Sequence, residues 1–300
     1  MGQIEAAPLE SLNWRREPLP VSKQLPEESP RRMAIPRSRR LVIDLLRLHQ
    51  QVPTSAHDRI CDLSAVAAVR ANANVRISWP MLFIKAYSLV AQKYPQLRQI
   101  FMRWPWAHLY QHPTSVATVV TFRDVDNEPW LFWSRFSRPE HKSLATLQDK
   151  MDEYQTGPVE KMFHKQWVFS TLPSFLRRII WWWTLNVSGE KRARRTSTFV
   201  LTTVGSRGAE IQHPPGFLTG NLTYGPIDEN GRCRVTLAYD HRIMDGRIVA
   251  DILADLEQTL NEVIVAELEG LSPIRPDVIP MLRFTSEAAT NSDTPESESA

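Results

Sequence analysis

The segment 234–269 constrains the fold most strongly, because it joins an extended stretch, a short loop and a long helical stretch. Apolar residues alternate with small or polar residues from Val235 to Tyr239, which predicts a half-buried strand. From about Gly246 to Glu269 apolar residues recur at helical spacing, which predicts a long helix. His241 lies in the loop between these elements, where a scaffold presents reactive groups.

The rest of the chain also mixes helices and strands. A leucine stripe predicts a helix from about Arg37 to Gln50, and a proline suited to a first helical turn predicts another that begins near Pro80. Further patterns predict strands at about Arg59 to Leu63, Ser115 to Phe122, Thr198 to Val204 and Leu222 to Tyr224. Helices interspersed with such strands favour an α/β fold in which helices pack on a mixed sheet.

Composition fits one globular body between two polar ends. The chain has 300 residues, of which 42% are hydrophobic and 23% charged, as in an ordinary globular protein. Residues 1–32 are rich in Pro, Glu and Arg, and residues 285–300 are acidic, so we expect disordered tails there. No repeat or long linker divides residues 33–284, which form one predicted domain. The first residues contain no apolar signal run, which indicates a cytoplasmic protein.

Charge and cysteine content argue against several classes of function. The 36 basic and 33 acidic residues give a net charge of +3, which offers no general reason to bind nucleic acid. Cys61 and Cys233 show no CxxC or metal-ligand spacing, and the histidines show no metal spacing either. We therefore expect neither a disulfide framework nor a metal site.

His241 is the strongest candidate for chemistry. A histidine in a loop after a strand can remove a proton from a thiol or hydroxyl near neutral pH, which contributes about 10²- to 10⁴-fold to a rate when the geometry is right. Asp245 can orient the loop or neutralise an arginine, and Gly246 permits a close backbone approach. The alternative is a structural histidine at a strand end.

The string around His241 resembles the signature of the catalytic domain of 2-oxo acid dehydrogenase acyltransferases, which are similar in fold to chloramphenicol acetyltransferase. It reads Asp240-His241-Arg242-Ile243-Met244-Asp245-Gly246. Three other regions resemble that family in the same order: 34–43, 77–86 followed by 94–97, and 199–205. The resemblance implies a two-layer α/β fold, with a mixed sheet and helices on one face, and a homotrimer or larger trimer-based assembly.

The resemblance also implies two catalytic roles. His241 would be the general base that deprotonates the attacking group, and the hydroxyl of Thr202 would donate a hydrogen bond to the tetrahedral oxyanion. Thr203 is the register-shifted alternative. Loss of one such donor typically costs about 10²- to 10³-fold in turnover. Because the active site of this family lies between subunits, His241 and Thr202 would come from different chains.

Supporting residues and substrates follow from the same resemblance. Asp245 would be paired with an arginine of the first helix, with Arg40 preferred over Arg39, and Gly246 would support the loop. The implied activity is transfer of an acyl group, other than an aminoacyl group, between coenzyme A and an unidentified acceptor. A lipoyl group on a separate protein is an alternative substrate, because residues 1–32 cannot hold a lipoyl domain.

A tryptophan- and arginine-rich segment at about 172–195 departs from the family pattern. Trp181, Trp182 and Trp183 are consecutive, and several arginines surround them. Packing in the core or at a subunit interface, a peripheral membrane contact through Trp181–Trp183, and an acyl or nucleotide pocket are the open interpretations. Two alternatives to an acyltransferase remain: a non-catalytic trimeric scaffold that binds a partner or membrane, and kinship with peptide-synthetase condensation domains.

Overall fold

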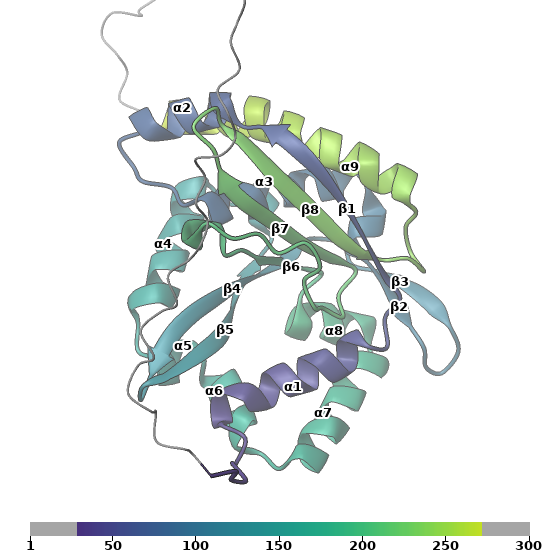
Figure 1. The fold of residues 1–300 in the computed structure, drawn as a ribbon. Coiled ribbons are helices and arrows are strands. Elements are labelled where there is room, and N and C mark those ends of the chain that lie inside the picture. The colour runs from purple at the N-terminus through teal and green to yellow at the C-terminus, as the bar shows by residue number, and fades with distance from the viewer. Residues whose placement is uncertain (1–28, 272–300) are drawn as a thin grey trace, which may run out of the picture. The chain divides into compact units, whose positions relative to one another are not determined.

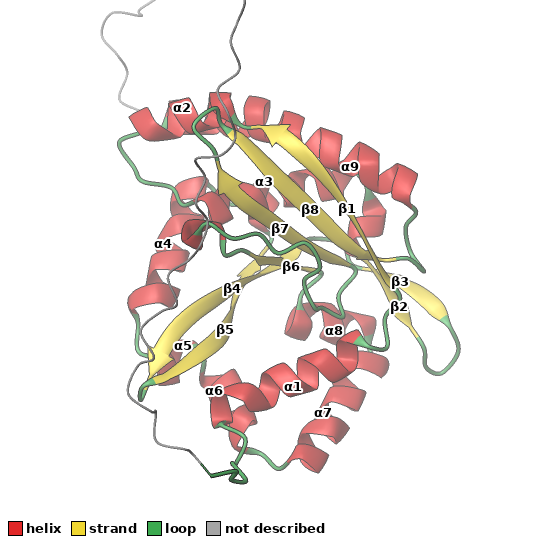
Figure 2. Cartoon of the chain, viewed as in Figure 1, coloured by secondary structure: helices red, strands yellow, loops and turns green. Residues whose placement is uncertain are grey.

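The computed structural model describes residues 29–271, so the predicted tails lie outside the described residues except for 29–32. The chain divides into two compact units after Pro36, and every helix and strand of the described range belongs to the unit that begins at Arg37. This unit contains a six-stranded sheet in the order β1-β8-β7-β6-β4-β5 and a separate pair, β2-β3 (Figures 1 and 2). The strands are β1 (Thr54–Asp62), β2 (Gln99–Met102), β3 (His108–Gln111), β4 (Val116–Val125), β5 (Glu128–Ser137), β6 (Phe199–Thr202), β7 (Gly220–Ile227) and β8 (Arg232–Asp240).

Helices connect and flank these strands. The α-helices are α1 (Arg37–His49), α2 (Ser64–Asn72), α3 (Trp79–Lys93), α4 (Leu144–Thr156), α5 (Val159–Met162), α6 (His164–Thr171), α7 (Ser174–Asn186), α8 (Gly189–Thr196), α9 (Gly246–Thr259) and α10 (Val265–Gly270). Short 3₁₀ turns are η2 (Pro95–Arg98), η3 (Pro139–His141) and η4 (Gly205–Arg207). A π-helical turn, η5 (Leu260–Ile264), joins α9 to α10, so the predicted long helix is present with one widened turn.

The sheet is mixed and covered by helices, which confirms the predicted α/β class. Strand β6 runs parallel to β4 and β7, whereas the β1–β8, β7–β8 and β4–β5 pairs are antiparallel. Helices α3 and α9 lie on one face of the sheet (Figure 1). The main core forms between these helices and the sheet, where Phe83, Leu237 and Val249 are fully buried. Burial of this apolar area supplies most of the stabilisation of the unit.

The opposite face of the sheet is less completely covered. On β4, Ala117 and Val119 join the main core, whereas Thr118 and Val120 point to the other side because side chains alternate along a strand. Helices α1 and α7 contribute side chains on that side and leave a cavity between themselves and β4, β5 and β6. Helices therefore contribute to both sides of this part of the sheet, in addition to the predicted helical layer.

Strand β5 is one of the elements that the sequence patterns do not predict. Trp130 and Phe132 pack in a cluster with Val159 and Phe163, whereas Leu131 and Trp133 line the cavity. Apolar residues thus face both sides, so the alternation that identifies a half-buried strand is absent.

The segment 172–195 forms most of helices α7 and α8. Arg177 donates to both carboxylate oxygens of Asp44 on α1, at 2.7 and 3.3 Å, and both side chains are buried. Trp181 also points inward, with its indole nitrogen 3.4 Å from the Asp44 carboxylate. In contrast, Trp182 and Trp183 are exposed. Trp182 and Trp183 are therefore the exposed part of the tryptophan run, and Trp181 anchors the helix.

Within residues 29–271, the arginines at the start of α1 form no ion pair with a carboxylate. Arg37 donates to the Ser170 hydroxyl at 2.7 Å and to the Trp167 carbonyl at 2.6 Å, and its guanidinium lies 4.1 Å from the Trp167 ring centre. These contacts, including the cation–π contact, offset the unfavourable position of a positive charge at a helix N-terminus.

Candidate active site

His241 is the first residue after β8, and its backbone is fixed by a tertiary contact. Its N–H donates to the Pro53 carbonyl at 3.0 Å, which ties the loop to the residue before β1. The imidazole is about half exposed (49%), and its Nδ1 lies 3.5 Å from Asp245 Oδ1. The ring also lies 5.7 Å from that of Tyr239. His241 therefore has a fixed backbone and an accessible ring, as a general base requires.

The structure does not form the predicted ion pair between Arg40 and Asp245 within one chain. Arg40 donates to the Ser170 carbonyl at 3.4 Å, because α1 packs beside α6 rather than beside the His241 loop. Arg39, the alternative, is exposed. The only ion pair of Asp245 within the described residues is with His241, and its side chain is 79% exposed. Asp245 thus lies beside the histidine instead of bridging to α1.

Gly246 begins α9 at a point of close approach, as the sequence suggests. A Cβ atom at this position would lie 2.8 Å from Nε2 of His57, so the His57 ring would have to move. His57 also lies 5.6 Å from the Tyr239 ring. No sequence motif singles out His57, and only its position on β1 beside β8 brings it to this loop.

Thr202 and Thr203 differ in their side-chain hydrogen bonds. The Thr203 hydroxyl donates to the Tyr224 carbonyl at 2.8 Å and accepts from the Gly205 N–H at 3.0 Å. The Thr202 hydroxyl has no such bond within the described residues, and Thr202 lines the cavity beside Val200. Thr203 is therefore a structural residue, and Thr202 has a hydroxyl available for a ligand.

The cavity beside Thr202 has a volume of about 260 Å³ and a mostly apolar wall. This volume is near the lower end for small-molecule sites. Its wall is built by α1, β4, β5, β6, α7 and the loop before β7, which supply Leu45, Val120, Trp133, Val200, Trp181 and Phe217. Such a cavity favours an apolar group of moderate size, placed next to the Thr202 hydroxyl.

Two polar residues in this cavity were not identified from the sequence. Asn221 is fully buried, and neither its amide oxygen nor its amide nitrogen has a hydrogen-bond partner within the described residues. Arg135 Nε is likewise buried without a partner, and burial lowers the pKa of this guanidinium. Their sequence signal is weak, because each is one polar residue within an otherwise apolar strand. Buried polar groups usually have partners, so both are available to a ligand.

His241 and Thr202 are far apart in one chain. Thr202 pairs with Thr223 on β7, which pairs with Thr236 on β8, so two inter-strand spacings separate Thr202 from β8. His241 lies beyond Thr236 toward the C-terminal end of β8. With about 4.8 Å per strand spacing and about 3.3 Å per residue, the separation is roughly 19 Å. Reacting groups must approach to about 3–3.5 Å, so the two residues cannot act on one carbonyl within a single chain.

The described residues offer neither a reactive thiol nor a metal site. Burial raises the pKa of both cysteine thiols, Cys61 and Cys233, to about 12, so both remain protonated at neutral pH. No cluster of three or more His, Cys, Asp or Glu side chains that could hold a metal occurs in residues 29–271. Across the same residues, every helix is too short or too polar to cross a membrane.

Solved structures of other proteins share the fold of this chain, whereas sequence comparisons find no match. No protein-family model and no curated protein matches the sequence. The dihydrolipoamide acetyltransferase of Azotobacter vinelandii is 15% identical and superposes with a TM-score of 0.58, covering 83% of this chain and 99% of that chain. The cubic core of a pyruvate dehydrogenase complex is 16% identical, with a TM-score of 0.58 and the same coverage.

A third solved structure gives the same result. A probable dihydrolipoamide acetyltransferase from Listeria monocytogenes is 15% identical, with a TM-score of 0.56 over 82% of this chain and 97% of that chain. Nearly the whole of each solved chain is thus covered, although few residues are identical. The chain therefore has the fold of the catalytic core of the 2-oxo acid dehydrogenase acyltransferases.

Proposed function

We propose that this protein is an acyltransferase that moves an acyl group between coenzyme A and a thiol, hydroxyl or amine acceptor. The observation that carries the proposal is Thr202, whose hydroxyl has no hydrogen-bond partner in the described part of the chain and which lines an apolar cavity. In an acyl-transfer reaction, a donor at this position stabilises the negative charge that develops on the carbonyl oxygen.

His241 supplies the proton transfer in this proposal. The imidazole removes the proton of the attacking thiol, hydroxyl or amine, and the attack forms a tetrahedral intermediate whose oxyanion accepts a hydrogen bond from Thr202. The intermediate then collapses, the acyl bond to the leaving group breaks, and the imidazolium returns its proton to that group. Asp245, with its carboxylate 3.5 Å from Nδ1, helps to orient the ring.

The site requires a second subunit, because Thr202 and His241 are roughly 19 Å apart in one chain. We propose a homotrimer in which the Thr202 cavity of one chain is completed by His241 of its neighbour. The similarity to a cubic core supports this state, because threefold axes pass through the corners of a cube.

The cavity also indicates the substrate class. Its apolar wall favours an acyl or acceptor group that is apolar, with the buried Asn221 amide and Arg135 Nε available to one polar group on it. Dihydrolipoamide remains a candidate acceptor, since its dithiol is carried on an aliphatic chain. The similar proteins named as dihydrolipoamide acetyltransferases support its inclusion among the acceptors tested.

An assay of free thiol tests the function. Purified protein is incubated with acyl-CoAs of increasing chain length and with thiol, alcohol or amine acceptors, including dihydrolipoamide. The expected result is release of CoA thiol that falls about 10²- to 10³-fold in Thr202→Val, because the oxyanion donor is lost. Thr203→Val is the matched control, since it should lower stability by about 1 kcal/mol while the chemical step is retained. Equal turnover in wild type and His241→Ala would refute the mechanism.

A further inference from the structure

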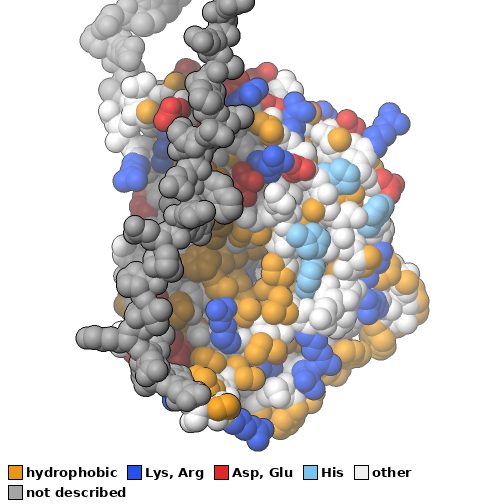
Figure 3. Space-filling view, in the orientation of Figure 1, with side chains coloured by type: hydrophobic (Ala, Val, Ile, Leu, Met, Phe, Trp, Pro, Cys, Tyr) orange, Lys and Arg blue, Asp and Glu red, His pale blue; other side chains and the backbone are white. Residues whose placement is uncertain are grey.

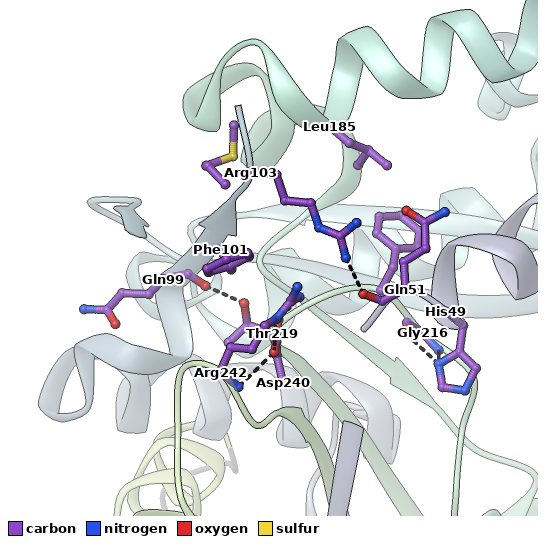
Figure 4. A network of polar contacts seen from close by, with 12 residues as sticks. His49, Gln51, Gln99, Phe101, Arg103, Leu185, Gly216, Thr219, Asp240 and Arg242 are labelled. Atoms are coloured by element: carbon purple, nitrogen blue, oxygen red, sulfur yellow. Dashed lines mark hydrogen bonds and ion pairs between the residues drawn. The ribbon is translucent and has the colours of Figure 1, made fainter. Parts of the chain in front are cut away.

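Three arginines converge on a second, smaller cavity. Arg103 follows β2, Arg192 lies on α8 and Arg242 follows His241, yet all three line a cavity of about 50 Å³. Figure 4 shows Arg103 directed toward Gln51, and Arg242 lying against Asp240. No aspartate or glutamate lines this space among the described residues. We call it the arginine cavity.

Asp240, the acidic residue beside the arginine cavity, is already paired with Arg242. Arg242 donates to both oxygens of Asp240, at 2.8 and 2.5 Å, and its guanidinium also lies 4.3 Å from the Phe101 ring centre. Asp240 is almost fully buried, so this ion pair is a fixed part of the structure. The pair neutralises one of the three guanidinium groups, and neither Arg103 nor Arg192 forms an ion pair with a carboxylate of residues 29–271.

Arg192 is held in place by backbone carbonyls instead of by an acid. Its guanidinium donates to the carbonyls of Phe101 at 3.0 Å, Leu185 at 3.3 Å and Phe217 at 3.4 Å. Its Nε is buried and has no hydrogen-bond partner within the described residues. Burial and the neighbouring charge of Arg242 lower the pKa of Arg192 to about 10. A buried cation beside other cations is destabilising unless an anion joins it.

The volume indicates the size of that anion. A water molecule needs roughly 10–15 Å³ in this measure, so about 50 Å³ accommodates roughly four oxygen-sized atoms. That is the size of a phosphate group, and guanidinium groups bind phosphate oxygens in the bidentate manner that suits their planar geometry. We propose that the arginine cavity is a binding site for a phosphate group.

The phosphate can come from inorganic phosphate or from a phosphorylated ligand such as coenzyme A. Phe217 lines both the arginine cavity and the apolar cavity that contains Thr202, so the two spaces are neighbours. Phosphate binding itself does not depend on the proposed acyl transfer. Only the assignment of the phosphate to coenzyme A rests on that function.

Titration calorimetry and thermal unfolding with sodium phosphate test the site, with sodium chloride at equal ionic strength as the reference. Phosphate should bind the wild type and raise its Tm, because a ligand that binds the folded state stabilises it. Arg103→Gln is the informative variant, since Arg103 is exposed and its only hydrogen bond in the described residues is to the Gln51 carbonyl. This variant should bind phosphate about tenfold or more weakly.

Arg76→Gln is the matched control, because Arg76 is exposed and does not line the cavity. It removes the same charge and should leave phosphate affinity unchanged. Absence of phosphate binding, or equal weakening in both variants, would overturn the proposal.

A second arm identifies the source of the phosphate. Coenzyme A, coenzyme A without its 3′-phosphate, and pantetheine are titrated into wild type and Arg103→Gln. If the variant weakens only complete coenzyme A, the site holds the 3′-phosphate. If it weakens inorganic phosphate but none of the three, the site serves another phosphate. Failure of acyl transfer with retained phosphate binding would reject the proposed function alone.

Discussion

A mixture of two inactive variants should regain activity if the active site forms between subunits. His241→Ala lacks the base and Thr202→Ala lacks the oxyanion donor, so trimers of either variant alone should be nearly inactive. In a mixed trimer, the Thr202 of a His241→Ala chain can face the His241 of a Thr202→Ala chain. Such a site contains both groups.

The expected recovery follows from the geometry. The roughly 19 Å between the two residues excludes a site within one chain, so the proposed site uses two neighbouring chains. Tandem purification retains only trimers that contain both variants. In a cyclic trimer with two chains of one variant and one of the other, one of the three sites is complete, so about one third of the wild-type activity should return. A site within one chain would give no complete sites.

The assay is release of CoA thiol after the two variants are co-expressed with different affinity tags and purified in tandem. Native mass measurement confirms that mixed trimers are present, and re-mixed wild-type chains with the same two tags provide the reference. Both substitutions remove surface-accessible side chains, so unfolding midpoints should remain close to wild type. Mixed trimers with no more activity than the separate variants would refute the shared site.

Three further predictions concern stability and surfaces. Asp44→Ala should lower the free energy of unfolding by about 3–5 kcal/mol, because it leaves Arg177 buried without its partner. Glu153→Gln, in the exposed pair with Lys150, should lower it by less than about 1 kcal/mol. Denaturant titration measures both, and similar losses would contradict a structural role for the buried pair. The two cysteine thiols, with pKa values raised to about 12 by burial, should stay unreactive toward a disulfide reagent at pH 8 until the protein is unfolded, so rapid modification of folded protein would contradict their burial. The exposed apolar face of α7 should bind anionic liposomes; Figure 3 shows hydrophobic and basic side chains together near it. The double variant Trp182→Ser, Trp183→Ser should reduce cosedimentation with the liposomes. A changed oligomer mass without a change in liposome binding would instead identify this face as a subunit contact.

The local sequence pattern was sufficient to predict the helices and strands whose apolar residues follow one regular period. The helix at 37–49, the strand that ends at Asp240 and the long helix from Gly246 follow from residue spacing, because large apolar side chains recur along one face of each. β5 was missed because it is apolar on both faces. Its turn, Asp126-Asn127, has φ angles of 53° and 62°, a geometry suited to a tight hairpin.

The sequence by itself determined which residues could carry the chemistry. His241 follows a predicted strand and precedes a predicted helix, and the surrounding string directed attention to Thr202 and to Asp245. These inferences depend on neighbours in the chain and on the order of motifs, which a sequence contains directly.

Only the tertiary structure decided what those residues contact. It bonded the Thr203 hydroxyl to the backbone and gave that of Thr202 no partner within residues 29–271. It also placed Arg40 beside Ser170 instead of Asp245, and brought Arg192 and Arg242 to one cavity. It also separated Thr202 from His241 by strand register. Hydrogen-bond partners, cavities and distances across a sheet depend on how distant segments pack, and local periodicity does not contain that information.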